Sequence, residues 1–252
     1  MFLSIAWDQI ADLYDTYVHA DFDIPFFVDE ARAVKGEVLE LMCGTGRVTL
    51  PLLQAGAKLT CVDNSSEMLT LLRRKLDAQH LAADVRQIDV RELMLDKQFD
   101  LILIPFHSLG ELVSADDRRA TLKRIHAQLT DRGRLIVTLH NPPLRLKSID
   151  DHLHLVGKHL LPERESLFFW TWQSYDPDRR IVTGYQFYEL YDARGIMQRK
   201  RMLEIRFALL GPDEFADLAR SEGFQVQSLY GDYRRSPFDP TASPYQIWIL
   251  TK

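Results

Sequence analysis

Glycine and acidic residues stand at the ends of two apolar runs in the first half of the sequence, at a spacing that suits a bound nucleoside. The first run, residues 38–41, leads into Gly44-Thr45-Gly46 and then into a helical stretch. Glycines in such a turn let the backbone approach a ligand closely. Asp63 ends the second run, where a carboxylate can accept hydrogen bonds from both hydroxyl groups of a ribose. The pattern therefore predicts a site for an adenosine-like ligand.

Two other ligand-binding turns fit this stretch less well. A dinucleotide fingerprint that starts at Gly44 requires glycine or alanine at position 49, where the chain has Thr49, so a nicotinamide cofactor is disfavoured. A P-loop ends in Gly-Lys-Ser/Thr, whereas Arg47 and Val48 follow Gly46, which argues against a nucleoside triphosphate. A glycine-bearing turn without any ligand stays open for this motif taken alone.

Four segments in chain order carry a recognisable pattern. The first is Glu40-Leu41-Met42-Cys43-Gly44-Thr45-Gly46, and the others are Val62 to Leu69, Gln87 to Val90 and Phe99 to Ile104. Together they resemble the strand-end motifs of the class I S-adenosylmethionine-dependent methyltransferases. The one departure in the first motif is Met42, which replaces the first glycine of the family's pattern. The resemblance extends over residues 36–140 and, more loosely, over the last two strands.

This resemblance implies how S-adenosylmethionine would be bound. Asp63 would hold the ribose, Met68 would flank the adenine, and Asp89 would accept a hydrogen bond from the adenine amino group. The loop Phe106 to Gly110 would face the reacting methyl group. The full set of expected cofactor-binding residues is Tyr14, Glu40, Met42, Gly44, Thr45, Gly46, Asp63, Asn64, Met68, Asp89, Val90 and Phe106.

Two histidines lie where a reaction at this site would need a base. His107 and His140 each follow a predicted strand, at the edge where open α/β sheets bind ligands. Either histidine could be the general base. Neither has to be one, because positioning of the reactants alone can lower the activation barrier by about 7 to 11 kcal/mol. His152, His154 and His159 follow soon after His140, but no carboxylate or cysteine stands at ligand spacing, so no metal site is predicted.

Short apolar runs alternate with amphipathic stretches, which predicts an α/β fold with a parallel sheet and helices on both faces. The resemblance implies that this is the Rossmann-like sheet of class I methyltransferases, with an antiparallel last strand. Strands are expected at 38–41, 59–62, 85–88, 101–104, 135–139, 226–230 and 247–251. Helices are expected at 48–54, from Asn64 with Glu67 completing a capping box, at 116–129, and between 211 and 223.

Two segments lie outside this alternation. Ile10, Leu13, Tyr14 and Tyr17 form a helical stripe, which makes residues 1–35 an expected N-terminal helical lid. Turn sequences join predicted strands at 168–175, 181–191 and 197–207, so residues 145–207 are expected to be an antiparallel insert after the fifth strand. The methyltransferase domain would then comprise residues 36–144 and 208–252.

Aromatic residues of the insert fall into two alternating sets. Phe168, Trp170 and Trp172 share one face of a predicted strand, and Tyr185, Phe187 and Tyr191 share a face of the next. These rings are expected either to pack on the body of the protein or to form a wall that binds the acceptor. The insert would in the second case be an acceptor-side lid.

Composition narrows the partners. Thirty-one basic and thirty-six acidic residues give a net charge of −5, the wrong sign for a nucleic-acid partner. No apolar window is long enough for a membrane span, and the start MFLSIAWD lacks the basic n-region of a signal peptide. Cys43 and Cys61 are predicted to be buried thiols, which fits a reducing cytoplasm.

Asn141-Pro142-Pro143 resembles part of a motif of amino-methyltransferases that act on adenine or cytosine. It follows the fifth predicted strand instead of the fourth, and Leu144 replaces the aromatic residue, so a turn is predicted there. The combined reading is methyl transfer from S-adenosylmethionine to a small-molecule acceptor, on nitrogen or oxygen, by in-line displacement. The alternatives are a nicotinamide-dependent oxidoreductase and a non-catalytic protein that keeps the cofactor fold. A homodimer is compatible with the sequence, which does not fix the oligomeric state.

Overall fold

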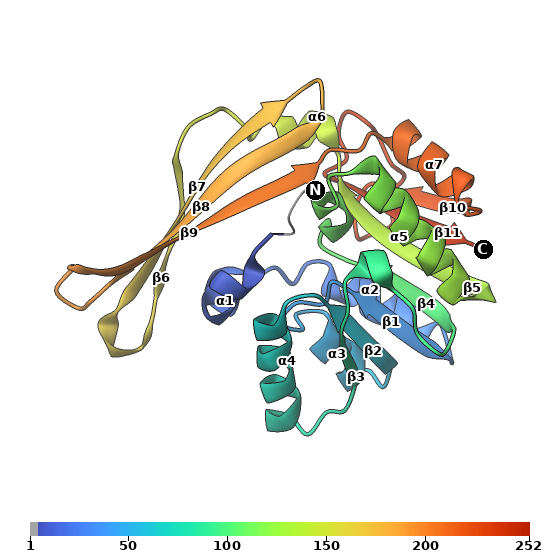
Figure 1. Ribbon diagram of the computed structural model, residues 1–252, viewed down its shortest axis with the longest axis horizontal. Coiled ribbons are helices and arrows are strands. Elements are labelled where there is room, and N and C mark those ends of the chain that lie inside the picture. The colour runs from blue at the N-terminus through green and yellow to red at the C-terminus, as the bar shows by residue number, and fades with distance from the viewer. Residues whose placement is uncertain (1–4) are drawn as a thin grey trace.

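The computed structural model describes residues 5–252, which form a seven-stranded sheet and a four-stranded sheet (Figure 1). The first four residues of the expected N-terminal segment lie outside the described part. The helices are α1 (Ala11–Tyr17), α2 (Ile24–Arg32), α3 (Thr49–Gln54), α4 (Ser66–Ala78), α5 (Ala115–Gln128), α6 (Pro142–Leu146) and α7 (Pro212–Ser221), with 3-10 turns η1 (Trp7–Gln9), η2 (Val90–Glu92), η3 (Ser108–Glu111) and η4 (Pro162–Arg164). None of the helices within residues 5–252 is long and apolar enough to cross a membrane.

The seven-stranded sheet has the strand order β10-β11-β5-β4-β1-β2-β3. Its strands are β1 (Glu37–Leu41), β2 (Lys58–Asp63), β3 (Asp84–Gln87), β4 (Phe99–Ile104), β5 (Leu129–His140), β10 (Gln225–Tyr230) and β11 (Tyr245–Thr251). β1 pairs in parallel with β2 and β4, whereas β11 is antiparallel to both β5 and β10. The predicted parallel-rich sheet with an antiparallel last strand is thus confirmed. The chain reverses direction across the sheet between β1 and β4, and the carboxyl ends of strands at such a switch point form a ligand crevice.

Side chains of the central strands alternate between two apolar cores. Leu39 belongs to the core that α5 and α7 cover, which includes Phe215, while Val38 belongs to the core that α2, α3 and α4 cover. A parallel sheet that is buried on both faces requires apolar side chains at successive positions, which explains the nearly continuous apolar runs. Cys43 and Cys61 are buried free thiols in the second of these cores, as predicted.

The four-stranded sheet is the expected antiparallel insert. Its order is β6-β7-β8-β9, with β6 (His154–Leu160), β7 (Ser166–Asp176), β8 (Ile181–Tyr191) and β9 (Met197–Ala208). In Figure 1 it extends to one side of the molecule, with α1 between it and α4. A third core forms there, in which Ile10 and Leu13 pack with Leu167, Phe169 and Leu203. The stripe in the N-terminal segment therefore covers one face of the insert.

Three local predictions are wrong. The helix expected from Asn64 begins at Ser66, because the Ser65 hydroxyl caps it by accepting a hydrogen bond from Met68 N at 3.1 Å. The Glu67 N–H, which in the expected capping box would donate to the Asn64 side chain, donates instead to the Asp8 carboxylate at 3.1 Å.

The other two concern the turn expected at Asn141 and the start of the strand expected at 135–139. Asn141 precedes the short helix α6, where proline in the first turn needs no hydrogen-bond partner for its nitrogen. Residues 131–133 lie inside β5, which begins directly after α5. The insert also has one strand more than expected, β6. Its sequence gives no strand pattern because it is an exposed edge strand without apolar alternation.

Candidate active site

The turn after β1 takes left-handed backbone conformations at the positions where the family's motif has glycine. Gly44 and Gly46 have φ of 55° and 87°, and Met42 has φ of 57°. For a residue with a side chain this conformation costs about 1–2 kcal/mol, so Met42 carries strain that a glycine would avoid. A Cβ at Gly46 would lie 2.4 Å from Cδ1 of the buried Leu72 of α4, whereas one at Gly44 would meet no atom of the described residues within 4 Å. Gly46 therefore lets α4 pack closely, and Gly44 leaves room beside the turn.

Asp63, the last residue of β2, ties this turn to the neighbouring strand. Its Oδ2 accepts a hydrogen bond from Gly44 N at 2.8 Å and its Oδ1 accepts one from Ser65 N at 2.9 Å. Burial raises the pKa of Asp63, while these backbone hydrogen bonds act in the opposite direction. Each carboxylate oxygen has a second lone pair, so the side chain can still accept hydrogen bonds from a ligand.

A cavity of about 240 Å³ opens beside Asp63, at the carboxyl edge of the sheet. Two groups of residues line it. The strand-end side consists of Met42, Gly44, Asp63, Asn64, Met68, Ile88, Asp89, Val90, Phe106, His107, Ser108, Glu111, Leu112 and His140. The cover side consists of Ile5, Trp7, Tyr14, Tyr17, Val18, Gln186, Ile205 and Phe207, from the N-terminal segment and the insert.

Most of the residues predicted for the cofactor site line this cavity, and three do not. Glu40 is buried behind the turn, where Thr49 Oγ1 donates a hydrogen bond to its Oε2 at 2.6 Å. Burial raises the pKa of Glu40 to about 8. Thr45 donates to Asp15 Oδ1 at 2.7 Å, and Gly46 packs on Leu72. These three residues shape and anchor the turn instead of lining the cavity.

His107 and His140 both line the cavity, and their rings stack with centroids 3.8 Å apart. Burial, with the nearby Arg145 guanidinium, lowers the pKa of His107 to about 3. Burial also lowers the pKa of His140, and His107 and Arg145 act in the same direction. Both rings are therefore neutral near pH 7, and a group with so low a pKa is a weak base.

The loop after β4 enters the cavity wall through two residues with left-handed backbone conformations. Phe106 and His107 have φ of 56° and 65°, two successive left-handed residues. Such pairs persist only where their surroundings hold them. Here the Arg47 guanidinium lies 4.4 Å from the centre of the Phe106 ring, and Asp23 holds Arg47 by an ion pair at 2.5 Å. The part of the cavity wall formed by Phe106 is thus held by an ion pair whose two residues do not themselves line the cavity.

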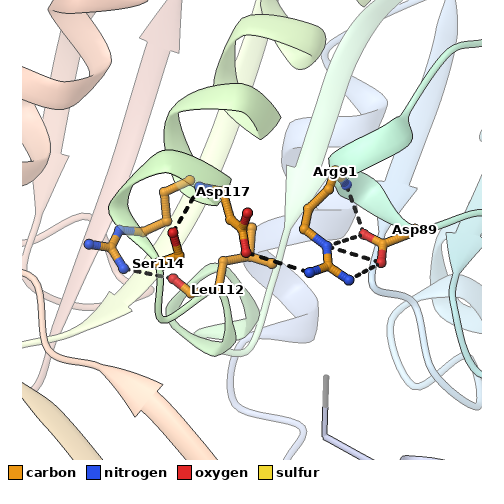
Figure 2. A network of polar contacts seen from close by, with 6 residues as sticks. Asp89, Arg91, Leu112, Ser114 and Asp117 are labelled. Carbon is orange, nitrogen blue, oxygen red and sulfur yellow. Dashed lines mark hydrogen bonds and ion pairs between the residues drawn. The ribbon is translucent and has the colours of Figure 1, made fainter. Parts of the chain in front are cut away.

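Asp89 lines the cavity at the end of β3 and is also part of a polar network (Figure 2). Its Oδ1 accepts from Arg91 N at 2.9 Å, and Arg91 Nη2 donates to its Oδ2 at 2.5 Å. The Arg91 hydrogen bonds lower the pKa of Asp89. Arg91 also reaches Asp117 at 3.5 Å, and Ser114 caps the helix that contains Asp117. The network fixes the end of β3 against the start of α5.

Several lining residues had no signal in the sequence. Glu111 of η3 accepts a hydrogen bond from Trp7 Nε1 at 3.1 Å, and neither residue belongs to a motif. Three residues of the insert also face the cavity, namely Gln186, Ile205 and Phe207. The alternation of side chains along β8 and β9 predicts them only if the face of the insert that points to the cavity is already known. The expected acceptor wall is wrong in this respect. Trp170, Trp172 and Tyr185 do not line the cavity, and alternation puts them on the opposite face, where Trp172 stacks on Tyr185.

The clustered histidines do not gather around the cavity. His152 and His154 contact Asp150 on the exposed segment that leads into β6. Within residues 5–252 no three His, Cys, Asp or Glu side chains are grouped so that they could hold a metal ion.

Comparison with known proteins agrees with this geometry. Residues 38–133 match the family model of a methyltransferase domain. The provisionally named methyltransferase YqeM of Bacillus subtilis is 24% identical over 96% of this chain and 95% of its own. The CcbJ methyltransferase from Streptomyces caelestis has a similar structure, with a TM-score of 0.82, 22% identity and 98% coverage of both chains. CalS10 from Micromonospora echinaspora, an amino pentose methyltransferase solved with S-adenosylmethionine bound, gives a TM-score of 0.73 at 15% identity, covering 100% of this chain and 98% of its own.

The sheet order, the glycine turn and the acidic residue after β2 define a Rossmann-like methyltransferase. Residues 38–133 form the methyltransferase domain that the family model describes, and S-adenosylmethionine is the cofactor of the enzyme.

Proposed function

We propose that this enzyme methylates a small molecule on nitrogen or oxygen, inside the cavity between the sheet and the insert. The observation that carries the proposal is the covered cavity, because eight of its lining residues come from the N-terminal segment and the insert. A polymer substrate would need an open and usually basic groove. The likeness of the fold to that of an amino pentose methyltransferase supports the same reading.

The residues that would hold the cofactor are those of the strand-end side. Asp63 would accept hydrogen bonds from the ribose hydroxyls, Met68 and Val90 would flank the adenine, and Asp89 would share its carboxylate between Arg91 and the adenine amino group. The open space beside Gly44 suits a close approach to the backbone. The sulfonium of the cofactor supplies a methyl group with a good leaving group, so the enzyme mainly has to position the acceptor in line.

The remaining predicted site residues have supporting roles in this proposal. Tyr14 and Phe106 would close the cavity around the cofactor, with Asn64 and Met42 beside them. Glu40, Thr45 and Gly46 would act by holding the turn in shape. His107 and His140 would form a neutral aromatic wall that orients the acceptor, since their low pKa values disfavour a role as general base.

The domain organisation in this proposal has three parts. Residues 36–144 and 208–252 form the methyltransferase domain, and the described residues 5–35 and the insert 145–207 close over it. Trp7, Tyr14 and Phe207 are the residues through which these two segments would enclose the acceptor. Closing the cavity in this way would exclude water from the reacting groups.

The test combines binding with product analysis. Calorimetry should show binding of S-adenosylhomocysteine and no binding of NAD. The protein is then incubated with methyl-labelled cofactor and a cell extract, and the labelled products are separated by size. Label in a product below roughly the size of a short peptide is expected. Label confined to protein, RNA or DNA would overturn the proposal.

A further inference from the structure

Glu111 is a carboxylate in the cavity wall that the cofactor motifs leave unexplained. It ends η3, the turn that follows β4, and it lies on the strand-end side of the cavity. Trp7 Nε1 donates a hydrogen bond to Oε2 at 3.1 Å. No described residue donates a hydrogen bond to Oε1. This oxygen is not fully buried, so a ligand in the cavity can reach it. One oxygen is therefore held by the N-terminal segment and the other is open to the cavity.

The charged side chains among the described lining residues of the cavity are acidic. Asp63, Asp89 and Glu111 line it, and no lysine or arginine is among its described lining residues. Asp89 is paired with Arg91, and Asp63 accepts two backbone hydrogen bonds. Among residues 5–252, Glu111 has only the neutral indole N–H of Trp7 as its hydrogen-bond partner. A cationic ligand group is attracted to such a site, and an anionic one is repelled.

We propose that the acceptor is a protonated aliphatic amine, whose ammonium group binds Glu111 and gives up a proton to Oε1 before methyl transfer. This inference rests on the proposed function and narrows its nucleophile to nitrogen. After the proton has moved, the amine nitrogen forms a bond to the methyl carbon with its lone pair. The carbon–sulfur bond breaks, and the sulfur keeps the electron pair as a neutral thioether. The product leaves as a methylammonium ion, and Glu111 releases its proton to water.

The surroundings of Glu111 suit proton uptake near neutral pH. Burial raises its pKa to about 7, the Trp7 hydrogen bond lowers it, and the negative charge of Asp63 raises it. Tyr14 also faces Glu111, and burial raises the pKa of its phenol, so it stays neutral. A carboxylate with a pKa near the working pH is an effective proton acceptor.

Oxygen acceptors fit this site less well. An alcohol holds its proton far too tightly for a carboxylate to remove it. A phenol would become an anion beside Asp63 and Glu111, in a cavity whose described lining residues include no positively charged side chain. Only an amine becomes a neutral nucleophile when it loses one proton to Glu111.

The test uses the full-length enzyme and two matched variants. Glu111→Gln keeps the shape and removes the charge, and Glu204→Gln removes a carboxylate from β9 that pairs with Arg206 outside the cavity. Each protein is incubated with methyl-labelled S-adenosylmethionine and a small-molecule extract, and the products are separated by cation exchange at pH 7. Affinity for S-adenosylhomocysteine is measured in parallel by calorimetry. Carbon-13 spectra of the glutamate carboxyl groups give a readout that needs no acceptor.

The expected product is retained as a cation and is an N-methylated amine. Glu111→Gln should lower its rate of formation about 100-fold or more, with the dissociation constant of S-adenosylhomocysteine within about two-fold, while Glu204→Gln should change neither. The initial rate should rise as pH increases through 7 in the wild type, because the free carboxylate is the active form. Of the glutamate carboxyl signals that titrate near neutral pH, the one near pH 7 should be missing in Glu111→Gln, whereas the Glu40 signal near pH 8 should persist.

Other outcomes separate the two levels of the proposal. An O-methylated product would overturn the amine inference and leave the proposed function standing. An N-methylated product formed equally well by Glu111→Gln, or no carboxyl signal titrating near neutral pH, would remove Glu111 from the proton transfer. Failure of the wild type to bind S-adenosylhomocysteine, or to label any small molecule, would overturn the proposed function itself.

Discussion

The two sides of the cavity are built in different ways. Most of the strand-end side follows from short stretches of sequence, since nearly all of its residues, Glu111 and Leu112 excepted, stand within about five positions of a sheet strand that fixes them. The cover side depends on contacts between segments far apart in the chain. The Asp8 carboxylate accepts from Ser65 Oγ at 2.5 Å, Asp15 pairs with Lys75 at 2.5 Å, and Tyr188 donates to Tyr17 at 2.9 Å. Mutations in the strand-end turns that carry the cofactor motifs should therefore act mainly on cofactor binding, and mutations in the insert should act mainly on acceptor binding.

The largest effect is expected from Gly46→Ala on the strand-end side. The new methyl group would force Leu72 to move, and φ of 87° disfavours any side chain. We expect the free energy of unfolding to fall by about 2 to 4 kcal/mol in urea denaturation. Gly44→Ala, which meets no atom within 4 Å, should cost about 1 to 2 kcal/mol. Equal losses for the two variants would contradict the account of the turn.

Asp63→Ala tests the cofactor half of the comparison. The change removes the partner of two backbone N–H groups and the expected partner of the ribose. Binding of S-adenosylhomocysteine should weaken by about 1.5 to 3 kcal/mol, the range for hydrogen bonds to a charged group. Asp84→Ala, at the half-buried start of β3 and outside the cavity, is the control. An unchanged dissociation constant in a folded Asp63→Ala protein would exclude Asp63 from the site.

Glu40→Gln examines a residue behind the strand-end side through pH. The pKa of Glu40 is about 8 in the folded protein, above its value of about 4.5 in an unfolded chain, so folding favours the protonated form. The wild type should therefore lose stability as pH rises from 5 to 9. Glu40→Gln should be more stable than the wild type at pH 9 and nearly equal to it at pH 5, because the glutamine carries no charge to bury. Thermal melts at the two pH values measure this, and parallel pH curves would refute it.

Phe207→Ala probes the cover side and should have the smallest effect. Phe207 lines the cavity beside His140, whereas Phe187 lies on the opposite face of the insert under Lys200. Losing the inward ring should raise the acceptor's KM about 10-fold and leave the affinity for S-adenosylhomocysteine nearly unchanged. Phe187→Ala should alter neither constant. If both variants bind acceptor normally, the insert has no part in recognition.

The same contrast explains what could be predicted from the sequence. Strands such as β1 and β4 are buried on both faces and stand out as apolar runs, and the glycine turn and Asp63 follow from spacing alone. β6 carries no such signal because it is exposed at the edge of its sheet. α2 was missed although Asp23 precedes a helix with Pro25 in its first turn, a pattern that marks helix starts.

The inward face of the insert could not be predicted from the strand itself. β7 has apolar side chains on both faces, with Leu167 and Phe169 on one and Phe168 and Trp170 on the other. Ile10 and Leu13 of the N-terminal segment determine which face turns inward, because they pack on Leu167 and Phe169. The position of Glu111 in the site could not be predicted for a related reason. Its hydrogen-bond partner, Trp7, lies more than a hundred residues earlier in the chain.

The third apolar core also sets an order of events during synthesis. Ile10 and Leu13 leave the ribosome first, but their partners in this core extend to Leu203 and Ile205 of β9. The amino-terminal helix therefore waits, without its apolar partners from the insert, until most of the chain has been made. Contacts between such distant residues close slowly, because the intervening chain must first lose its freedom. A nascent chain that stops before β7 would carry the glycine turn and Asp63 but would lack the insert that completes the cover of the cavity.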